Sequence, residues 1–149
     1  MDSTVASQSS PEADGVARPL RILVVDDNPD SADMLAMSLR MMGHHVLALY
    51  DPLQVVASAI EFQPDLAFLD VGMPVLNGYA LASQLRMQEW PVGNRPRLVA
   101  LTGWGQEEDR RRSEDAGFDH HLVKPADLDL IESVCLQVAA SLKGGGLAP

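Results

Sequence analysis

The sequence predicts an α/β domain in which a doubly wound parallel sheet lies between two layers of helices. Five short apolar segments alternate with five segments of helical periodicity along the chain, which is typical of right-handed βαβ crossovers. Four of the apolar segments are dominated by Val, Leu, Ile and Ala and show little alternation with polar residues. Strands that are covered on both faces have this pattern, because neither face meets water.

The first predicted helix has an apolar face at i, i+3, i+4 and i+7 from Ala32, and Gly43 supplies its stop. Asp51 and Pro52 begin the second helix as a cap and a first-turn proline. The other helices are expected at about 78–87, at about 106–116, and from the cap Asp127 to Leu142. The predicted strands are 21–26 (RILVVD), 45–49 (HVLAL), 66–70 (LAFLD), 97–102 (RLVALT) and 120–124 (HHLVK).

The chain has 149 residues, which is enough for one domain with one core. We expect a disordered tail at 1–18, the domain itself at 19–142, and a flexible tail at 143–149. The single cysteine, Cys135, excludes an intrachain disulfide and a multi-cysteine metal site.

The acidic composition restricts the possible partners. The chain has 21 acidic and 11 basic residues and a formal charge of −10, which argues against direct nucleic-acid binding and against docking on anionic lipid. No apolar run approaches the roughly 18 residues that span a bilayer, and the first residues lack the apolar core of a signal peptide. We therefore expect a cytoplasmic protein without a membrane segment.

Polar residues stand where the predicted strands end. Asp26 and Asp27 follow the first strand, Asp70 ends the third, Thr102 ends the fourth and Lys124 ends the fifth. In open parallel sheets, ligands bind at the carboxyl ends of the strands. The sequence therefore predicts that three carboxylates, a hydroxyl and an ammonium group converge at one edge.

Such a set suits phosphoryl chemistry. Two carboxylates about 4 Å apart repel by about 1 kcal/mol in water and by more near a protein surface, and a shared divalent cation would offset this repulsion. Oxygen ligands without His or Cys favour Mg²⁺, with Mn²⁺ as the alternative. A carboxylate can act as a nucleophile and form an aspartyl phosphate, while lysine and threonine side chains can contact the phosphoryl oxygens.

The motifs VVDDNPD at 24–30, LDVGMPVLNGYAL at 69–81, ALTGWGQ at 100–106 and GFDHHLVKP at 117–125 closely resemble the response regulator receiver domain of two-component signalling. The resemblance covers about residues 20–142. It implies a flavodoxin-like (βα)5 fold with strand order 2-1-3-4-5, and a function as a phosphorylated switch rather than as an enzyme with an external substrate. The last two motifs also resemble the C-terminal receivers of hybrid histidine kinases, which act as phosphorelay intermediates.

The resemblance implies a role for each site residue. Asp70 corresponds to the phosphoacceptor, which takes its phosphoryl group from a histidine kinase or a histidine phosphotransfer protein. Asp27 would bind Mg²⁺ directly, Asp26 mainly through water, and Gly72 through its backbone carbonyl. Two further residues, Thr102 and Lys124, would contact the phosphoryl group. Receivers of this kind promote their own phosphorylation and dephosphorylation.

The resemblance also implies a cis Lys124-Pro125 bond and a surface for a downstream protein on the fourth helix, fifth strand and fifth helix. Two features depart from the commonest pattern. His121 occupies the switch position where Tyr or Phe is usual, and Gly72 leaves no side chain two residues after the phosphoacceptor. Together with Trp104, Gly72 should affect the lifetime of the phosphoryl group.

Three other functions fit the sequence less well. A phosphohydrolase of the haloacid dehalogenase type needs a second Asp two residues after the nucleophile, where this chain has Gly72. A flavin-binding flavodoxin-like protein needs Ser, Thr and Gly amides in its first loop, whereas DDNPD would repel a phosphate. An inert receiver-like interaction domain would not need a complete site.

Overall fold

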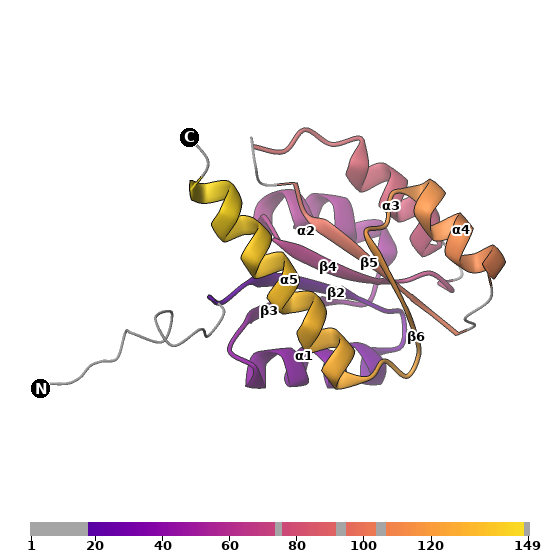
Figure 1. The fold of residues 1–149 in the computed structure, drawn as a ribbon. Helices are drawn as coiled ribbons and strands as arrows, with labels where there is room; N and C mark the ends of the chain where they lie inside the picture. Colours follow the sequence, from indigo (N-terminus) through magenta and orange to yellow (C-terminus); the bar gives the residue numbers. More distant parts are fainter. Residues whose placement is uncertain (1–17, 74–75, 92–94, 104–106, 148–149) are drawn as a thin grey trace, which may run out of the picture.

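The computed structural model describes residues 18–73, 76–91, 95–103 and 107–147, which build one parallel sheet with helices on both faces (Figure 1). The strands run in the spatial order β3-β2-β4-β5-β6, which is 2-1-3-4-5 counted along the chain. The predicted fold class and strand order are confirmed. The strands are β2 (Arg21–Val25), β3 (His45–Leu49), β4 (Leu66–Asp70), β5 (Arg97–Thr102) and β6 (His120–Val123).

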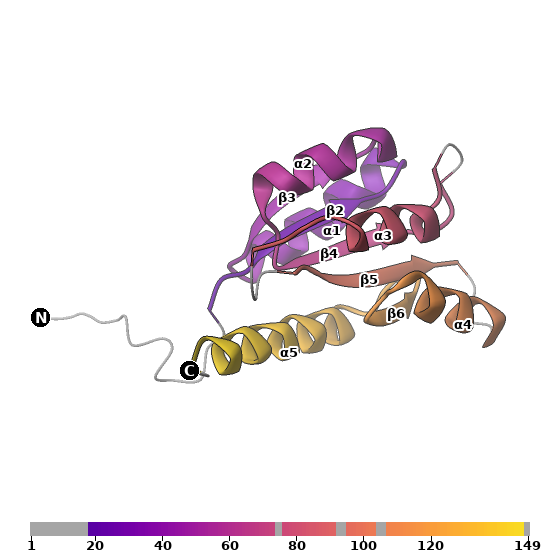
Figure 2. The ribbon, with the colours of Figure 1, turned by 90° about the horizontal axis from the view of Figure 1, so that it is seen from above.

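The helices follow the strands along the chain, and a short 3₁₀ turn η2 (Pro52–Gln54) precedes the second of them. Figure 2 shows α5 and α3 on opposite sides of β5. The helices are α1 (Pro29–Met41), α2 (Val55–Phe62), α3 (Gly78–Arg86), α4 (Glu107–Ala116) and α5 (Leu128–Leu147).

Two apolar cores lie on the two faces of the sheet, because alternate residues of each strand point to opposite faces. Ile22 and Val24 of β2 belong to the core that packs under α1 and α5. Leu23 and Val25 belong to the core that packs under α2 and α3. All four side chains are fully buried, which explains why the strand sequences lack polar alternation.

The observed strands end within one residue of their predicted limits, whereas the helix limits differ more. Helix α1 starts at Pro29, because Asn28 caps it by accepting hydrogen bonds from the amides of Asp30 and Ser31. The predicted stops Gly43 and Gly117 have φ angles of 101° and 100°, a region that favours glycine.

Helix α5 continues to Leu147, five residues into the segment 143–149 where a flexible tail is predicted, and residues 148–149 lie outside the described residues. Extending an existing helix adds one hydrogen bond for each residue that is fixed, and this continuation overrides the low helix propensity of the three glycines at 144–146. None of the helices in the described part of the chain is long and apolar enough to cross a membrane.

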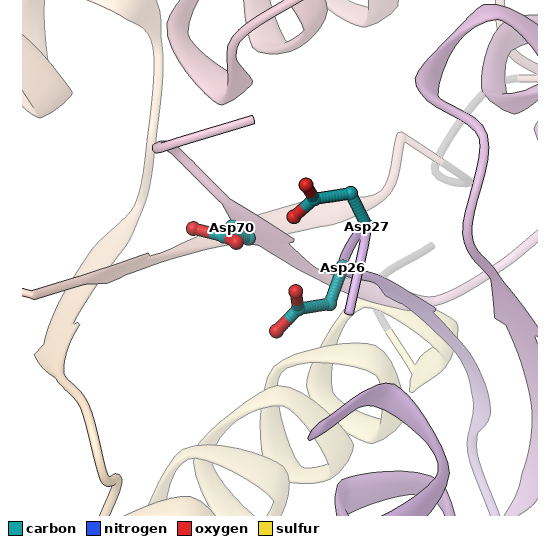
Figure 3. Close-up of side chains that lie close together, drawn as sticks. All are labelled: Asp26, Asp27 and Asp70. Carbon is teal, nitrogen blue, oxygen red and sulfur yellow. The ribbon is translucent and has the colours of Figure 1, made fainter. Parts of the chain in front are cut away.

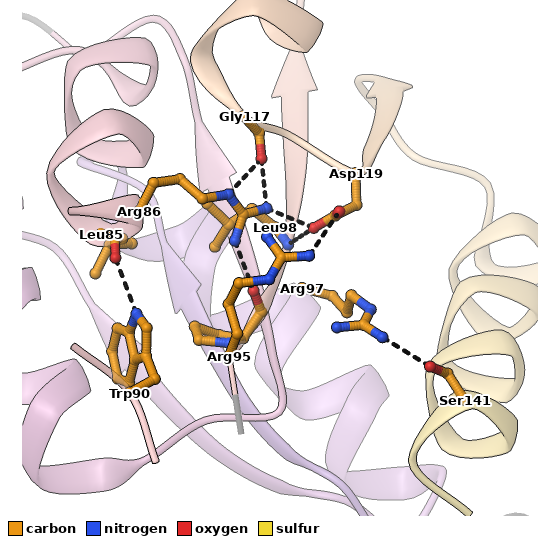
Figure 4. Close-up of polar contacts among 10 residues, drawn as sticks. Leu85, Arg86, Trp90, Arg95, Arg97, Leu98, Gly117, Asp119 and Ser141 are labelled. Atoms are coloured by element: carbon orange, nitrogen blue, oxygen red, sulfur yellow. Dashed lines mark hydrogen bonds and ion pairs between the residues drawn. The ribbon is translucent and has the colours of Figure 1, made fainter. Parts of the chain in front are cut away.

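A cluster of charged and polar groups at the end of α3 ties three segments together (Figure 4). Arg86 donates from Nε to the carbonyl of Gly117 at 2.8 Å and from Nη1 to the carbonyl of Pro96 at 3.0 Å. Its Nη2 donates to Asp119 Oδ2 at 2.7 Å, and the same oxygen accepts from the amide of Leu98 at 2.8 Å. We call Arg86, Pro96, Leu98, Gly117 and Asp119 the Arg86 cluster. It fixes the start of β5 against the loop that leads into β6.

Trp90 has a structural role close to this cluster. Its indole nitrogen donates to the carbonyl of Leu85 at 2.9 Å, and the ring packs against the core under α2 and α3. Trp104, the other tryptophan, lies outside the described residues.

Candidate functional site

Three carboxylates converge where β2 and β4 end (Figure 3). Asp26, Asp27 and Asp70 each offer an oxygen, and these oxygens lie within 4.8 Å of one another. The strand register explains why Asp26 and Asp70 are close. Val25 pairs with Leu69, and the residue that follows each of them in the sequence is an aspartate. The sequence prediction that these acids meet is confirmed.

The turn after β2 holds Asp26 in place. Its side chain is 4% exposed, and Oδ1 accepts a hydrogen bond from the amide of Asn28 at 3.0 Å. The amide of Asp26 donates to the carbonyl of Leu49 in β3 at 3.1 Å. Asp27, the next residue, is exposed. The two adjacent acids therefore differ in burial, and only Asp27 presents a solvent-accessible carboxylate.

Backbone groups surround Asp70, which is 8% exposed. Its Oδ1 accepts from the amide of Gly72 at 2.9 Å. A Cβ at Gly78 would lie 2.7 Å from the Asp70 carbonyl oxygen, so only glycine lets α3 begin this close to Asp70. Sequence reasoning missed Gly78. The signal was the pair Asn77-Gly78, in which Asn77 caps α3 by accepting from the amide of Ala80.

Lys124 reaches two of the three acids. Its Nζ lies 3.0 Å from Asp26 Oδ2 and 3.5 Å from Asp70 Oδ2. The Lys124-Pro125 bond is cis, as the resemblance implies. Burial lowers the pKa of Lys124, but the hydrogen bond to Asp26 and the charge of Asp70 raise it by more, so its pKa lies above the ordinary value. The ammonium group therefore stays charged beside the carboxylates.

The site carries an excess of negative charge. Three carboxylates and one ammonium group give this edge a formal charge of −2. Burial raises the pKa of Asp70, and the charge of Asp26 raises it further, while the Gly72 amide and Lys124 act in the opposite direction. A divalent cation matches this excess, and carboxylate oxygens are ligands that Mg²⁺ accepts. The residues present therefore fit Mg²⁺.

Thr102 and His121 form a pair beside these charges. Thr102 is 2% exposed, and its Oγ1 lies 3.3 Å from His121 Nε2. The carbonyl of Thr102 accepts from the amide of Lys124 at 2.6 Å, which links the pair to the lysine. Thr102, Lys124 and His121 are thus connected, as expected for neighbouring strand ends.

A groove of about 460 Å³ adjoins the site between α1 and the start of α5. Asp26 and Lys124 form part of its wall, and the rest is largely apolar. Met34 and Leu128 in its lining are 71% and 51% exposed. The groove gives the charged edge an apolar border.

The Response regulator receiver domain family matches residues 22–135. The chain is 35% identical to the DNA-binding dual master transcriptional regulator RpaA of Synechocystis. The alignment covers 83% of this chain and 49% of the relative. It therefore spans about half of that relative.

Two solved structures have the same fold. One is the receiver domain of a sensor histidine kinase from Pseudomonas aeruginosa, which has a magnesium ion coordinated in its active-site cleft. It is 30% identical, covers 83% of this chain and 99% of that chain, and has a TM-score of 0.72. The other is the Saccharomyces cerevisiae Ssk1 receiver domain in co-crystals with the histidine phosphotransfer protein Ypd1. It is 23% identical, covers 84% of this chain and 92% of that chain, and has a TM-score of 0.75.

The family match covers most of the chain, and the sheet order and the acidic edge agree with it. This chain therefore belongs to the response regulator receiver domain family, the phosphorylation-dependent signalling module of two-component systems.

Proposed function

We propose that Asp70 is the phosphoacceptor and that a histidine kinase or a histidine phosphotransfer protein is the donor. An Asp70 carboxylate oxygen attacks phosphorus, a P–O bond forms, and the P–N bond of the donor phosphohistidine breaks. The observation that carries the proposal is the convergence of Asp26, Asp27 and Asp70 with Lys124 at one edge of the sheet. The exposed Met34 and Leu128 beside that edge offer apolar contacts to a docking donor.

Asp26, Asp27, Asp70 and the carbonyl of Gly72 would hold Mg²⁺, with Mn²⁺ as a substitute. When bound, the cation supplies positive charge that offsets the carboxylates and the phosphoryl oxygens. The receiver of the Pseudomonas aeruginosa sensor kinase, with its magnesium ion, supports this assignment.

Lys124 and Thr102 contact the phosphoryl group in this proposal. Lys124 Nζ is already 3.5 Å from Asp70 Oδ2, so it is near the oxygens that gain charge during transfer. The protein promotes its own phosphorylation, and water later cleaves the acyl phosphate. It has no external substrate that it turns over.

The output surface comprises α4, β6 and α5, and a downstream protein binds there after phosphorylation. Thr102 and His121 transmit the effect of phosphorylation from Asp70 to this surface. The acyl phosphate shifts the populations of two conformations of this surface. We propose that these steps take place in the cytoplasm.

A second candidate is a receiver of a hybrid histidine kinase that passes its phosphoryl group onward. The 30% identity to a sensor-kinase receiver favours it. The two candidates differ in reversibility. A phosphorelay intermediate returns its phosphoryl group to a phosphotransfer protein within the lifetime of the acyl phosphate, whereas a terminal regulator loses it to water.

The test is intact-mass spectrometry after incubation with acetyl phosphate or phosphoramidate and Mg²⁺. We expect a gain of about 80 Da, the mass of one phosphoryl group, which alkaline treatment removes. Asp70→Asn should gain nothing, and a chelator should suppress the gain in the wild type. Equal labelling with and without divalent cation would show that the roles of Asp26 and Asp27 are wrong.

A further inference from the structure

The side chains of Thr102 and His121 lie on the same face of the sheet. The register pairs Ala100 with His121 and Thr102 with Val123. Because residues two apart on a strand share a face, Thr102 and Ala100 point the same way, and His121 points the same way as its partner Ala100. The imidazole is therefore the diagonal neighbour of the threonine, with Nε2 3.3 Å from Oγ1.

This hydrogen bond constrains the single proton of the Thr102 hydroxyl. If Nε2 accepts, the hydroxyl proton points to the imidazole. If Nε2 carries a proton and donates, the hydroxyl proton is available for another acceptor. The oxygens of a phosphoryl group on Asp70 carry about two negative charges at neutral pH and act only as acceptors. Thr102 can therefore donate to them and keep its bond to His121 only when Nε2 is the donor in that bond.

We propose that His121 is a positioning residue that donates from Nε2 to Thr102 in the phosphorylated protein and thereby directs the threonine proton to the phosphoryl group. This inference rests on the proposed function of Asp70 and Thr102. A phenylalanine at position 121 has no atom that can donate this bond, so the histidine supplies a polar connection that depends on which ring nitrogen holds the proton.

The direct test uses ¹⁵N-labelled wild-type protein with Mg²⁺ and beryllofluoride, which mimics a phosphoryl group on aspartate. Long-range ¹H–¹⁵N spectra report which ring nitrogen carries a proton. The spectra are recorded at several pH values, so that the neutral form of the ring is distinguished from the doubly protonated form. We expect the proton of His121 on Nε2 in the complex. A complex with Nε2 unprotonated would overturn the inference.

The same sample separates this inference from the proposed function. The amide of Gly72, which donates to Asp70 Oδ1, reports occupation of the acidic edge. If this signal does not move, the acidic edge does not take the mimic and the proposed function fails together with the inference. If it moves while His121 Nε2 stays unprotonated, only the inference fails.

Substitutions provide a second test. The side-chain amide of glutamine can donate from nearly the position of Nε2, so His121→Gln should keep beryllofluoride affinity within about twofold. His121→Phe removes the donor, and loss of one neutral hydrogen bond should weaken affinity about three- to tenfold. In a Thr102→Val background, His121→Phe should have no further effect. Two results would contradict the proposal. One is an equal loss of beryllofluoride affinity in His121→Gln and His121→Phe. The other is that His121→Phe lowers the affinity as much in the Thr102→Val background as in the wild type.

Discussion

The carboxyl edge of the sheet and the Arg86 cluster are two polar regions that differ in their balance of charge, because the first has an excess of carboxylates and the second pairs one guanidinium group with one carboxylate. At the carboxyl edge, three carboxylates share one lysine, and the pKa of Asp70 is raised by burial and by Asp26. In the Arg86 cluster, one guanidinium group meets two carbonyls and a carboxylate, and Asp119 also accepts from the Leu98 amide.

This difference distinguishes a structural cluster from a binding site. The groups of the Arg86 cluster satisfy one another, so removing one of them leaves others without partners and destabilises the fold. The carboxyl edge keeps an excess of negative charge that a bound cation would offset. We therefore expect mutations in the two regions to change stability in opposite directions.

The largest effect is expected from Arg86→Met. It removes the donor to the carbonyls of Gly117 and Pro96 and one of the donors to Asp119. Because these hydrogen bonds of partly buried groups are lost together, we expect a cost of about 3 kcal/mol of unfolding free energy. Urea denaturation measures this change. The matched control is Arg95→Met, because Arg95 is 47% exposed and 3.6 Å from Asp119. Arg95→Met should lower the unfolding free energy by less than about 1 kcal/mol. Equal losses of unfolding free energy in the two variants would contradict a structural role specific to Arg86.

Gly78→Ala should have the next largest effect. The new Cβ would lie 2.7 Å from both the Asp70 carbonyl oxygen and the Val71 Cα, so the backbone at Asp70 and Val71 must shift. We expect a loss of about 2 kcal/mol and slower labelling by acetyl phosphate. A Cβ at Gly103 meets no described atom within 4 Å, so Gly103→Ala serves as the control. If both variants behave like wild type, the close approach of α3 to Asp70 is not important.

Asp70→Asn should stabilise the metal-free protein at neutral pH by about 1 kcal/mol, because it removes one of three like charges. Folding raises the pKa of Asp70 above its ordinary 3.8, so the folded state holds this proton more tightly. Wild-type stability should fall as pH rises from about the ordinary value through the raised pKa, and the advantage of Asp70→Asn should vanish in acid.

Asp119→Asn sharpens this prediction, because it removes a carboxylate from the balanced cluster. It should lower the unfolding free energy where Asp70→Asn raises it. Urea melts of both variants at several pH values, without divalent cation, make the comparison. Destabilisation by Asp70→Asn would mean that the carboxyl edge is as well balanced as the Arg86 cluster.

The smallest effect concerns His44, which lies at the amino end of the sheet and accepts from the Leu20 amide through Nδ1 at 3.0 Å. Burial lowers its pKa, and His45 lowers it further. The unfolded chain therefore takes up a proton first, and stability should fall by less than about 1 kcal/mol as pH drops below about 6.5. His44→Gln should flatten this slope, while His45→Gln, at an exposed position, should keep most of it. An unchanged slope in His44→Gln would refute the assignment.

The sequence predicts the carboxyl edge well and the Arg86 cluster not at all, for a physical reason. Strand patterns depend on neighbouring residues, and the end of each strand must lie at one edge of a parallel sheet. Asp26, Asp70, Thr102 and Lys124 could therefore be placed together before the fold was known. The partners of Arg86 are up to 33 positions away, and no local pattern marks them.

Gly78 and the end of α5 are two further features that the local sequence alone does not explain. The need for glycine at position 78 comes from the backbone of Asp70, which is adjacent in space and eight residues away in sequence. The helix through residues 143–147 depends on the turns before it, whereas its composition favours a flexible tail. The pairing of Thr102 with His121 likewise follows from strand register and not from either residue alone.

The central claim is that, of the three neighbouring carboxylates, Asp70 alone takes the phosphoryl group while Asp26 and Asp27 hold the cation. Borohydride converts an aspartyl phosphate to homoserine, so peptide mass spectrometry after labelling with acetyl phosphate and Mg²⁺ can locate the modified residue. We predict homoserine at position 70 only, and none when a chelator replaces Mg²⁺. Homoserine at position 26 or 27, or undiminished modification in the chelator, would contradict the account.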